Sequence, residues 1–120
     1  MPPEILIADD DSTMRRLYSR VLSGQDYTVT FADSAATAKT LIETRHFDLL
    51  VTDLMLGDGL GTDLARLFSE KFSGARSLLV TGSAQNPGAM DLAAVSECLG
   101  KPLDTDRFML SVAKALAQTA

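Results

Sequence analysis

The sequence predicts an α/β fold, in which helices cover both faces of a parallel β-sheet. Five short apolar runs of strand length alternate with five longer stretches whose apolar residues recur at helical spacing. The connections between them are short, and strands joined through helices in this way become parallel, with right-handed crossovers. With 120 residues and no linker or internal repeat, the chain is expected to form a single domain over residues 1–120.

The first part of the chain predicts two strands and the helix between them. Residues 5–8 form an apolar run that ends abruptly in acidic residues, which is typical of a central strand. The helix that follows can be capped by Asp11 or Ser12, and Gly24 is its C-terminal stop. Residues 27–31 alternate between polar and apolar, which favours a half-exposed strand at the edge of the sheet.

The middle of the chain predicts the next helix and a central strand. Ser34 can cap a helix that ends near residues 45–46. Residues 49–52 are apolar or β-branched in succession, which indicates a strand buried on both faces, and Asp53 ends it. A charge at that position is costly unless something compensates it, so Asp53 is the first candidate functional residue.

The second half predicts two more strands. Residues 57–61 contain three glycines and predict a flexible loop, followed by a helix that Gly74 closes. Strands are predicted over residues 77–81 and 96–99, with a weaker helix over residues 87–95 between them.

The last helix and the strand order complete the predicted fold. Asp104 or Thr105 can cap this helix. The sheet is expected to be flavodoxin-like and doubly wound, with strand order 2-1-3-4-5, which places residues 27–31 at an edge as their alternation requires. The apolar residues expected to turn inward from the last helix are Phe108, Met109, Val112, Ala115 and Leu116.

Composition narrows the class of partner. No segment approaches the roughly 20 apolar residues needed to span a bilayer, and the chain does not begin like a signal peptide. A net charge of −5 argues against attraction to nucleic acid or anionic lipid. The single cysteine, Cys98, cannot form an internal disulfide and fits a reducing compartment. We therefore expect a cytoplasmic protein whose partner is a protein or a cation.

Polar residues collect where the predicted strands end. Ligands of an open α/β sheet bind outside the carboxyl ends of its strands, where the strand order reverses. We therefore expect these residues to share one pocket. They are Asp9 and Asp10 after the first strand, Asp53 ending the third, Thr81 ending the fourth and Lys101 after the fifth.

This set predicts phosphoryl transfer assisted by a metal ion. Three neighbouring carboxylates repel one another, and oxygen ligands without His or Cys in an open site suit Mg²⁺. With Lys101 facing an incoming anion and a hydroxyl from Thr81, Asp53 has the surroundings of a nucleophile that accepts a phosphoryl group. Taken alone, the acidic run at residues 9–12 is equally consistent with a helix cap and a solvated turn.

The chain resembles the receiver domains of two-component response regulators over essentially its whole length. The run from Asp9 to Arg16 is similar to the single-domain chemotaxis regulators. The residues that carry the resemblance are Ala8-Asp9-Asp10, Asp53, Thr81 followed by Gly82, and Lys101-Pro102.

The resemblance implies a role for each pocket residue. Asp53 would be the phosphoacceptor and Asp10 a direct metal ligand. Asp9 would bind the ion through water, and the backbone carbonyl of Met55 would be a third metal contact. Thr81 would turn toward the phosphoryl group after transfer, and Lys101 would pair with a phosphoryl oxygen. The Lys101-Pro102 bond would be cis, an isomer whose cost proline lowers to roughly 0.5 to 1 kcal/mol.

Three features depart from the family pattern. Cys98 stands where the family often has an aromatic residue that reports phosphorylation to the output face. Gly57 stands where proline is common, so we expect a more mobile loop over residues 57–61. Met55 and Ser83 occupy the variable positions that flank the phosphoryl pocket and influence the lifetime of the phosphorylated state.

The other motifs predict structure rather than chemistry. The G-x-G-x-G spacing of residues 57–61 matches neither the dinucleotide fingerprint nor a P-loop, and Asp58 would repel phosphate. His46 has no partner at catalytic or ligand spacing and is expected at the surface. Cys98 is expected to pack within its strand.

The leading functional hypothesis is a signalling switch. A histidine kinase or a histidine phosphotransfer protein would phosphorylate Asp53 with Mg²⁺ as cofactor, and the aspartyl phosphate would bias two conformations. The family's usual output surface, formed by its fourth helix, fifth strand and fifth helix, corresponds to residues 87–117, where a downstream effector protein would dock. We expect no attached output domain, no direct contact with nucleic acid or membrane, a monomer or weak dimer, and no enzymatic turnover beyond the domain's own phosphorylation and dephosphorylation.

Two other functions are open. A binding module that signals without phosphorylation would explain Cys98, although all five pocket residues are intact. A phosphatase with an aspartate nucleophile needs a second aspartate two residues after the first, and that position is Met55.

Overall fold

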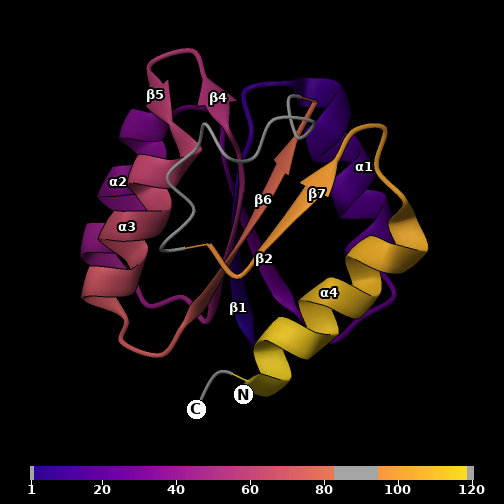
Figure 1. The fold of residues 1–120 in the computed structure, drawn as a ribbon. Coiled ribbons are helices and arrows are strands. Elements are labelled where there is room, and N and C mark those ends of the chain that lie inside the picture. Colours follow the sequence, from indigo (N-terminus) through magenta and orange to yellow (C-terminus); the bar gives the residue numbers. More distant parts are fainter. Residues whose placement is uncertain (1, 83–94, 119–120) are drawn as a thin grey trace.

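The structure, a computed structural model, describes residues 2–82 and 95–118. Its main sheet has five parallel strands in the order β2-β1-β3-β6-β7 (Figure 1). This order confirms the predicted 2-1-3-4-5 order and the flavodoxin-like doubly wound fold. The strands are β1 (Glu4–Ala8), β2 (Thr28–Ala32), β3 (Leu49–Asp53), β6 (Arg76–Thr81) and β7 (Glu97–Gly100).

Helices cover both faces of this sheet. In Figure 1, α1 and α4 lie on one side of the sheet, and α2 and α3 lie on the other. The helix predicted over residues 87–95 falls outside the described residues except for its last position, and Ser83 falls outside them as well. No helix in the described ranges is long and apolar enough to cross a bilayer. The helices are α1 (Ser12–Leu22), α2 (Ala35–Thr44), α3 (Gly61–Lys71) and α4 (Thr105–Gln118).

Alternation along the strands divides the apolar residues into two cores. Ile5 and Ile7 of β1 join Phe108 of α4 in one core, whereas Leu6 joins Phe68 of α3 in the other. β3 is buried along its length up to its last residue, and the edge strand β2 is mostly half-exposed, as the sequence predicted for each. Because β3 is the central strand, its last residue lies at the centre of the sheet's carboxyl edge.

Short polar side chains cap the first turns of α1, α2 and α4, whereas α3 begins after Leu60 without a side-chain cap. Asp11 caps α1 by accepting the amide two residues on at 2.9 Å, and Ser34 caps α2 by accepting the amide three residues on at 3.1 Å. Asp104 accepts the amide three residues on at 3.2 Å at the start of α4. The predicted stop at Gly24 is confirmed, because α1 ends at Leu22, Ser23 is its C-cap and Gly24 follows the cap directly.

Residues 57–61, predicted to be a flexible loop, have regular structure instead. β4 (Met55–Leu56) and β5 (Gly59–Leu60) pair antiparallel across a two-residue connection, and Gly61 is already the first residue of α3. Strands of two residues are too short to show a periodic pattern, so the sequence carried no signal for them. We call residues 55–60 the hairpin.

Candidate functional site

The carboxyl ends of the strands bring the predicted site residues together. β1 and β3 are adjacent and parallel, so Asp9 and Asp53 leave the sheet side by side. β6 follows β3 in the sheet and ends at Thr81, which is buried and stands opposite Gly100 of β7. These ends lie at the top of Figure 1, where the arrows of β6 and β7 point.

Asp9, Asp10 and Asp53 form an acid cluster, in which one carboxylate oxygen of each residue lies within 4.8 Å of the others. Asp9 is fully buried, the Asp53 side chain is 13% exposed, and Asp10 is open to solvent. Oδ1 of Asp9 accepts the amide of Asp11 at 2.9 Å, whereas Oδ2 is buried without a hydrogen-bond partner among the described residues. Because an unpaired buried acceptor is costly, this oxygen is suited to a cation.

Lys101 faces the acid cluster from the other side. Its Nζ lies 3.0 Å from Oδ2 of Asp53 and 3.7 Å from Oδ2 of Asp9. Its backbone amide donates to the carbonyl of Thr81 at 3.1 Å, which continues the pairing of β6 and β7 beyond the end of β7. The bond to Pro102 is cis, as the resemblance implies. The sheet itself thus positions the ammonium group over the carboxylates.

Burial and charge perturb the pKa values of this group. Burial raises the pKa of Asp9, and the carboxylates of Asp53 and Asp10 raise it further. The amide of Asp11 and the charge of Lys101 oppose this rise without cancelling it. Burial acts to lower the pKa of Lys101, but its hydrogen bond to Asp53 and the nearby negative charges outweigh burial and raise it. The lysine is therefore protonated at neutral pH.

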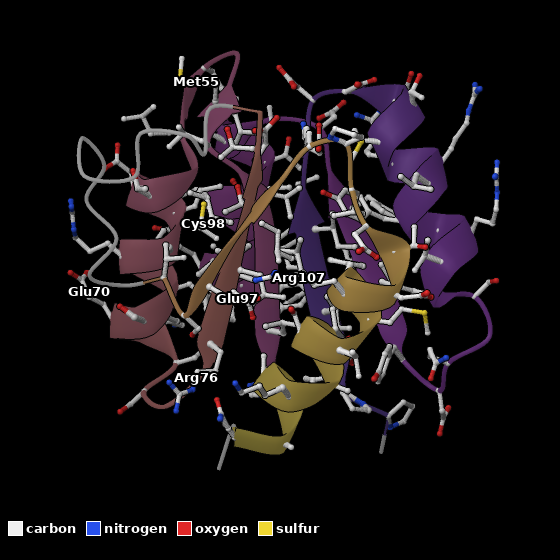
Figure 2. The ribbon with its side chains drawn as sticks, turned by 45° about the vertical axis from the view of Figure 1, so that its right-hand side comes forward. Met55, Glu70, Arg76, Glu97, Cys98 and Arg107 are labelled. Carbon is white, nitrogen blue, oxygen red and sulfur yellow. The ribbon has the colours of Figure 1, made fainter. Side chains whose placement is uncertain are left out.

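The donor set fits a hard divalent cation such as Mg²⁺. It consists of three carboxylates without a nearby His or Cys ligand, and the single charge of Lys101 does not balance them. The unpaired Oδ2 of Asp9 agrees with this fit. Met55, whose backbone carbonyl is the further predicted ligand, begins β4 directly beyond this cluster. The residue is 60% exposed, and its side chain points away from the fold (Figure 2).

The backbone around the acids is held by contacts that sequence reasoning missed. Each contact joins a side chain to a main-chain group, and main-chain groups leave no signature in the sequence because every residue has them. Arg15, Thr52 and Gly57 all lie in stretches that the sequence had singled out, but nothing in those stretches predicted these contacts. Arg15 Nη1 donates to the carbonyl of Asp9 at 2.8 Å, Thr52 Oγ1 to the carbonyl of Asp53 at 2.9 Å, and the amide of Gly57 to Oδ2 of Asp10 at 3.2 Å.

His46 and Cys98 take no part in the acid cluster. The His46 side chain is 68% exposed, as predicted, but it has a partner that the prediction missed, because Nε2 lies 2.9 Å from Oδ1 of Asp48. Asp48 accepts the amide of Glu4, at the opposite end of β1 from the acids. Cys98 is half-buried within β7, as predicted, and burial raises the pKa of its thiol.

Comparison with known proteins gives matches over nearly the whole chain. A family model described as "Response regulator receiver domain" matches residues 5–113. The alginate biosynthesis transcriptional regulatory protein AlgB of Pseudomonas putida is 34% identical over 114 residues, which cover 93% of this chain and 25% of AlgB. The chain therefore spans about a quarter of the length of that relative.

A shorter relative and a solved structure match along most of their own lengths as well. The response regulator receiver protein CpdR of Brucella abortus is 31% identical over 115 residues, covering 93% of this chain and 95% of CpdR. A crystal structure of a CheY-like response regulator receiver domain protein from Methanospirillum hungatei superposes with a TM-score of 0.90 at 25% identity, covering 99% of this chain and 97% of that chain.

Proposed function

The chain belongs to the response regulator receiver domain family of two-component signalling, and we propose that it acts as a phosphorylatable switch. Asp53 accepts a phosphoryl group from the phosphohistidine of a histidine kinase or histidine phosphotransfer protein, in a reaction that requires Mg²⁺. The observation that carries this proposal is the setting of Asp53, which lies within the acid cluster and 3.0 Å from Nζ of Lys101.

The acid cluster would hold the metal ion. Asp9, Asp10 and Asp53, together with the backbone carbonyl of Met55, supply the oxygen ligands. When bound, Mg²⁺ neutralises negative charge on the oxygens of the transferring phosphoryl group. The unpaired oxygen of Asp9 supports this assignment, since it is buried and no described residue donates a hydrogen bond to it.

The residues of the chain itself carry out the transfer. A carboxylate oxygen of Asp53 attacks phosphorus, the bond between phosphorus and the histidine nitrogen breaks, and that nitrogen keeps the electron pair. The product is an acyl phosphate on Asp53. Lys101 then pairs with a phosphoryl oxygen and Thr81 donates its hydroxyl to another. Water later hydrolyses the acyl phosphate, so the domain catalyses its own modification and demodification but is not a turnover enzyme.

Phosphorylation switches a surface made by residues 87–95, β7 and α4, where an effector protein docks. An ion pair at 3.2 Å between Glu97 of β7 and Arg107 of α4 joins two of these elements (Figure 2). The net charge of −5 supports a protein partner over nucleic acid. We infer a single receiver domain over residues 1–120 that works in the cytoplasm as a monomer or weak dimer.

A binding module that works without phosphorylation is the second candidate. The observation that favours it is Cys98 on β7, at a position where the family often has an aromatic reporter of phosphorylation. In this case the acid cluster would be an inherited feature without a role in signalling.

Measurement of intact mass separates the two candidates. The protein is incubated with Mg²⁺ and either acetyl phosphate or phosphoramidate, and mass spectrometry then counts the phosphoryl groups gained. We expect one phosphoryl group on the wild-type protein and none on an Asp53→Asn variant, because the amide nitrogen and oxygen of asparagine are poor nucleophiles.

Two results would contradict the phosphorylatable switch. A wild-type protein that gains no phosphoryl group favours the phosphorylation-independent module, and an equal gain by Asp53→Asn places the chemistry on another residue. Circular dichroism of the variant verifies that the substitution has left the fold unchanged.

A further inference from the structure

The hairpin is too small to be stable by itself, and contacts at its base, middle and tip hold it in place. Pairs of two-residue strands are at best marginal in water. At its base, the amide of Gly61 donates to the carbonyl of Leu54 at 2.7 Å. In its middle, Leu56 is buried in the core beneath α2 and α3. At its tip, Asp58 reaches across to α2.

Asp58 caps the amino terminus of α2 from a distant part of the chain. Its Oδ1 accepts the amide of Ala35 at 2.7 Å and its Oδ2 accepts the amide of Ala36 at 3.0 Å. These amides belong to the first turn of α2, which has no partners for them within the helix. The negative charge also interacts favourably with the helix dipole, and the two hydrogen bonds lower the pKa of Asp58.

The residue before Asp58 connects the hairpin to the acid cluster. The amide of Gly57 donates to Oδ2 of Asp10 at 3.2 Å. Gly59, on the other side of Asp58, lies so close to α2 that a Cβ there would approach the Cβ of Ala35 to 3.0 Å. Asp58, which binds α2, is therefore next in the sequence to Gly57, which binds the predicted metal ligand Asp10 directly.

We propose that Asp58 is a positioning residue for the Mg²⁺ site. By binding two amides of α2, it holds the hairpin in the place where Gly57 orients Asp10 and where Met55, two residues after Asp53, begins β4. Asp58 itself touches neither the ion nor the phosphoryl group. This inference rests on the proposed function, because it assumes that the acid cluster binds Mg²⁺.

Coupling of this kind acts in both directions. If the contact between Asp58 and α2 strengthens Mg²⁺ binding, then Mg²⁺ binding must strengthen that contact by the same free energy. The amides of Ala35 and Ala36 report on it in the unmodified protein. We expect their ¹H–¹⁵N resonances to shift during a MgCl₂ titration with the same Kd as the resonances of the acid cluster.

The main test compares Mg²⁺ affinity among variants by the same NMR titration. We expect Asp58→Ala to raise the Kd for Mg²⁺ about tenfold, the lower end of the usual effect of losing a group that supports a metal ligand. Asp58→Asn keeps an oxygen acceptor for one of the two amides, so its Kd should stay within about threefold of wild type. If both variants lose the same affinity, the effect is one of charge alone and the positioning role is wrong.

Ser34→Ala is the matched control. Ser34 caps the same helix by accepting the amide of Thr37 at 3.1 Å, and the hydrogen bonds of its hydroxyl stay within α2, whereas Asp58 reaches α2 from the hairpin. Ser34→Ala and Asp58→Ala should both lower the thermal midpoint, whereas only Asp58→Ala should weaken Mg²⁺ binding. An equal loss of affinity in Ser34→Ala would show that helix stability alone matters, which would overturn the proposal.

The remaining outcomes are also decisive. If the wild-type protein does not respond to Mg²⁺, the proposed metal site and this inference both fail. If wild type binds Mg²⁺ and Asp58→Ala binds it equally well, only this inference fails. Should Asp58→Ala not fold, the resonances of Ala35 and Ala36 in wild type decide the question, because unchanged resonances at saturating Mg²⁺ contradict the coupling.

Discussion

Asp9 is the fully buried member of the acid cluster, and its ionisation at neutral pH destabilises the folded protein relative to the unfolded chain. Burial raises its pKa in the folded protein above the ordinary value of 3.8, which the unfolded chain retains. Between these two values the folded protein binds more protons than the unfolded chain. The free energy of unfolding therefore falls as pH rises from about 3.8 through the raised pKa.

Asp9→Asn is expected to stabilise the protein in the absence of Mg²⁺. Asparagine cannot ionise, and its side-chain oxygen can still accept the amide of Asp11. We expect a rise of about 4 °C in the thermal midpoint at pH 7, corresponding to roughly 1 kcal/mol, and a smaller rise at pH 4. Differential scanning calorimetry from pH 4 to pH 7 measures both values.

Asp10→Asn is the control for this pH dependence. Asp10 is exposed, so its carboxylate remains hydrated in the folded protein. Replacing it with asparagine removes repulsion within the cluster, but it does not remove a burial cost of the kind that Asp9 has. Its effect should be less than half that of Asp9→Asn. A stabilisation by Asp9→Asn that does not grow with pH would refute the role assigned to burial.

At the scale of an element, α3 depends on its first residue. A Cβ on Gly61 would overlap the backbone carbonyl of Asp53, and it would also press on the side chain of Thr52, which donates to that carbonyl. The start of α3 therefore lies directly against the backbone of the proposed phosphoacceptor. Only glycine allows the helix to begin so close to the end of β3.

Gly61→Ala should lower the free energy of unfolding by about 2 kcal/mol, since the backbone must shift to accept the methyl group. It should also slow phosphorylation by acetyl phosphate, because Asp53 moves with its carbonyl. Urea denaturation and intact mass measure the two effects. Gly24→Ala is the comparison, because a Cβ there meets nothing within 4 Å and its effect should be neutral or slightly stabilising. Equal destabilisation by both substitutions would contradict the steric explanation.

At the scale of the whole molecule, the sheet separates two cores. Phe68 of α3 and Phe108 of α4 are both fully buried, but they lie on opposite faces of the sheet and belong to different clusters. The central strands contribute to both clusters through alternate residues. The side chains of the two cores therefore belong to separate clusters, although they project from the same strands.

Phe68→Leu and Phe108→Leu should act independently. Each is expected to cost about 1 to 2 kcal/mol from the apolar contacts it loses. The double variant should lose the sum of the two within about 0.5 kcal/mol, because substitutions without shared partners are additive. Urea denaturation of the four proteins completes the double-mutant cycle. A coupling above about 1 kcal/mol would show that strain passes through the sheet.

Much of the architecture could be predicted because its signals are local. The alternation of polar and apolar residues over 27–31 predicted an edge strand, and the unbroken apolar run before Asp53 predicted a central one. The structure confirms both positions. A general rule about doubly wound sheets then placed Asp9 and Asp53 at one edge, and the structure brings them together. The hairpin could not be predicted, because two-residue strands have no detectable period.

The sequence by itself determined the order of the five strands of the main sheet and of helices α1 to α4, and which acidic, hydroxyl and basic residues end the strands. Hydrophobic periodicity and strand ends are properties of neighbouring residues, so they are visible along the chain. Only the tertiary structure decided that Asp9 is the buried acid, that Gly57 holds Asp10, and that Asp58 caps α2 instead of repelling a ligand. Burial and bonds to backbone amides depend on distances between segments remote in sequence, and every residue carries a similar backbone, so no residue pattern encodes them.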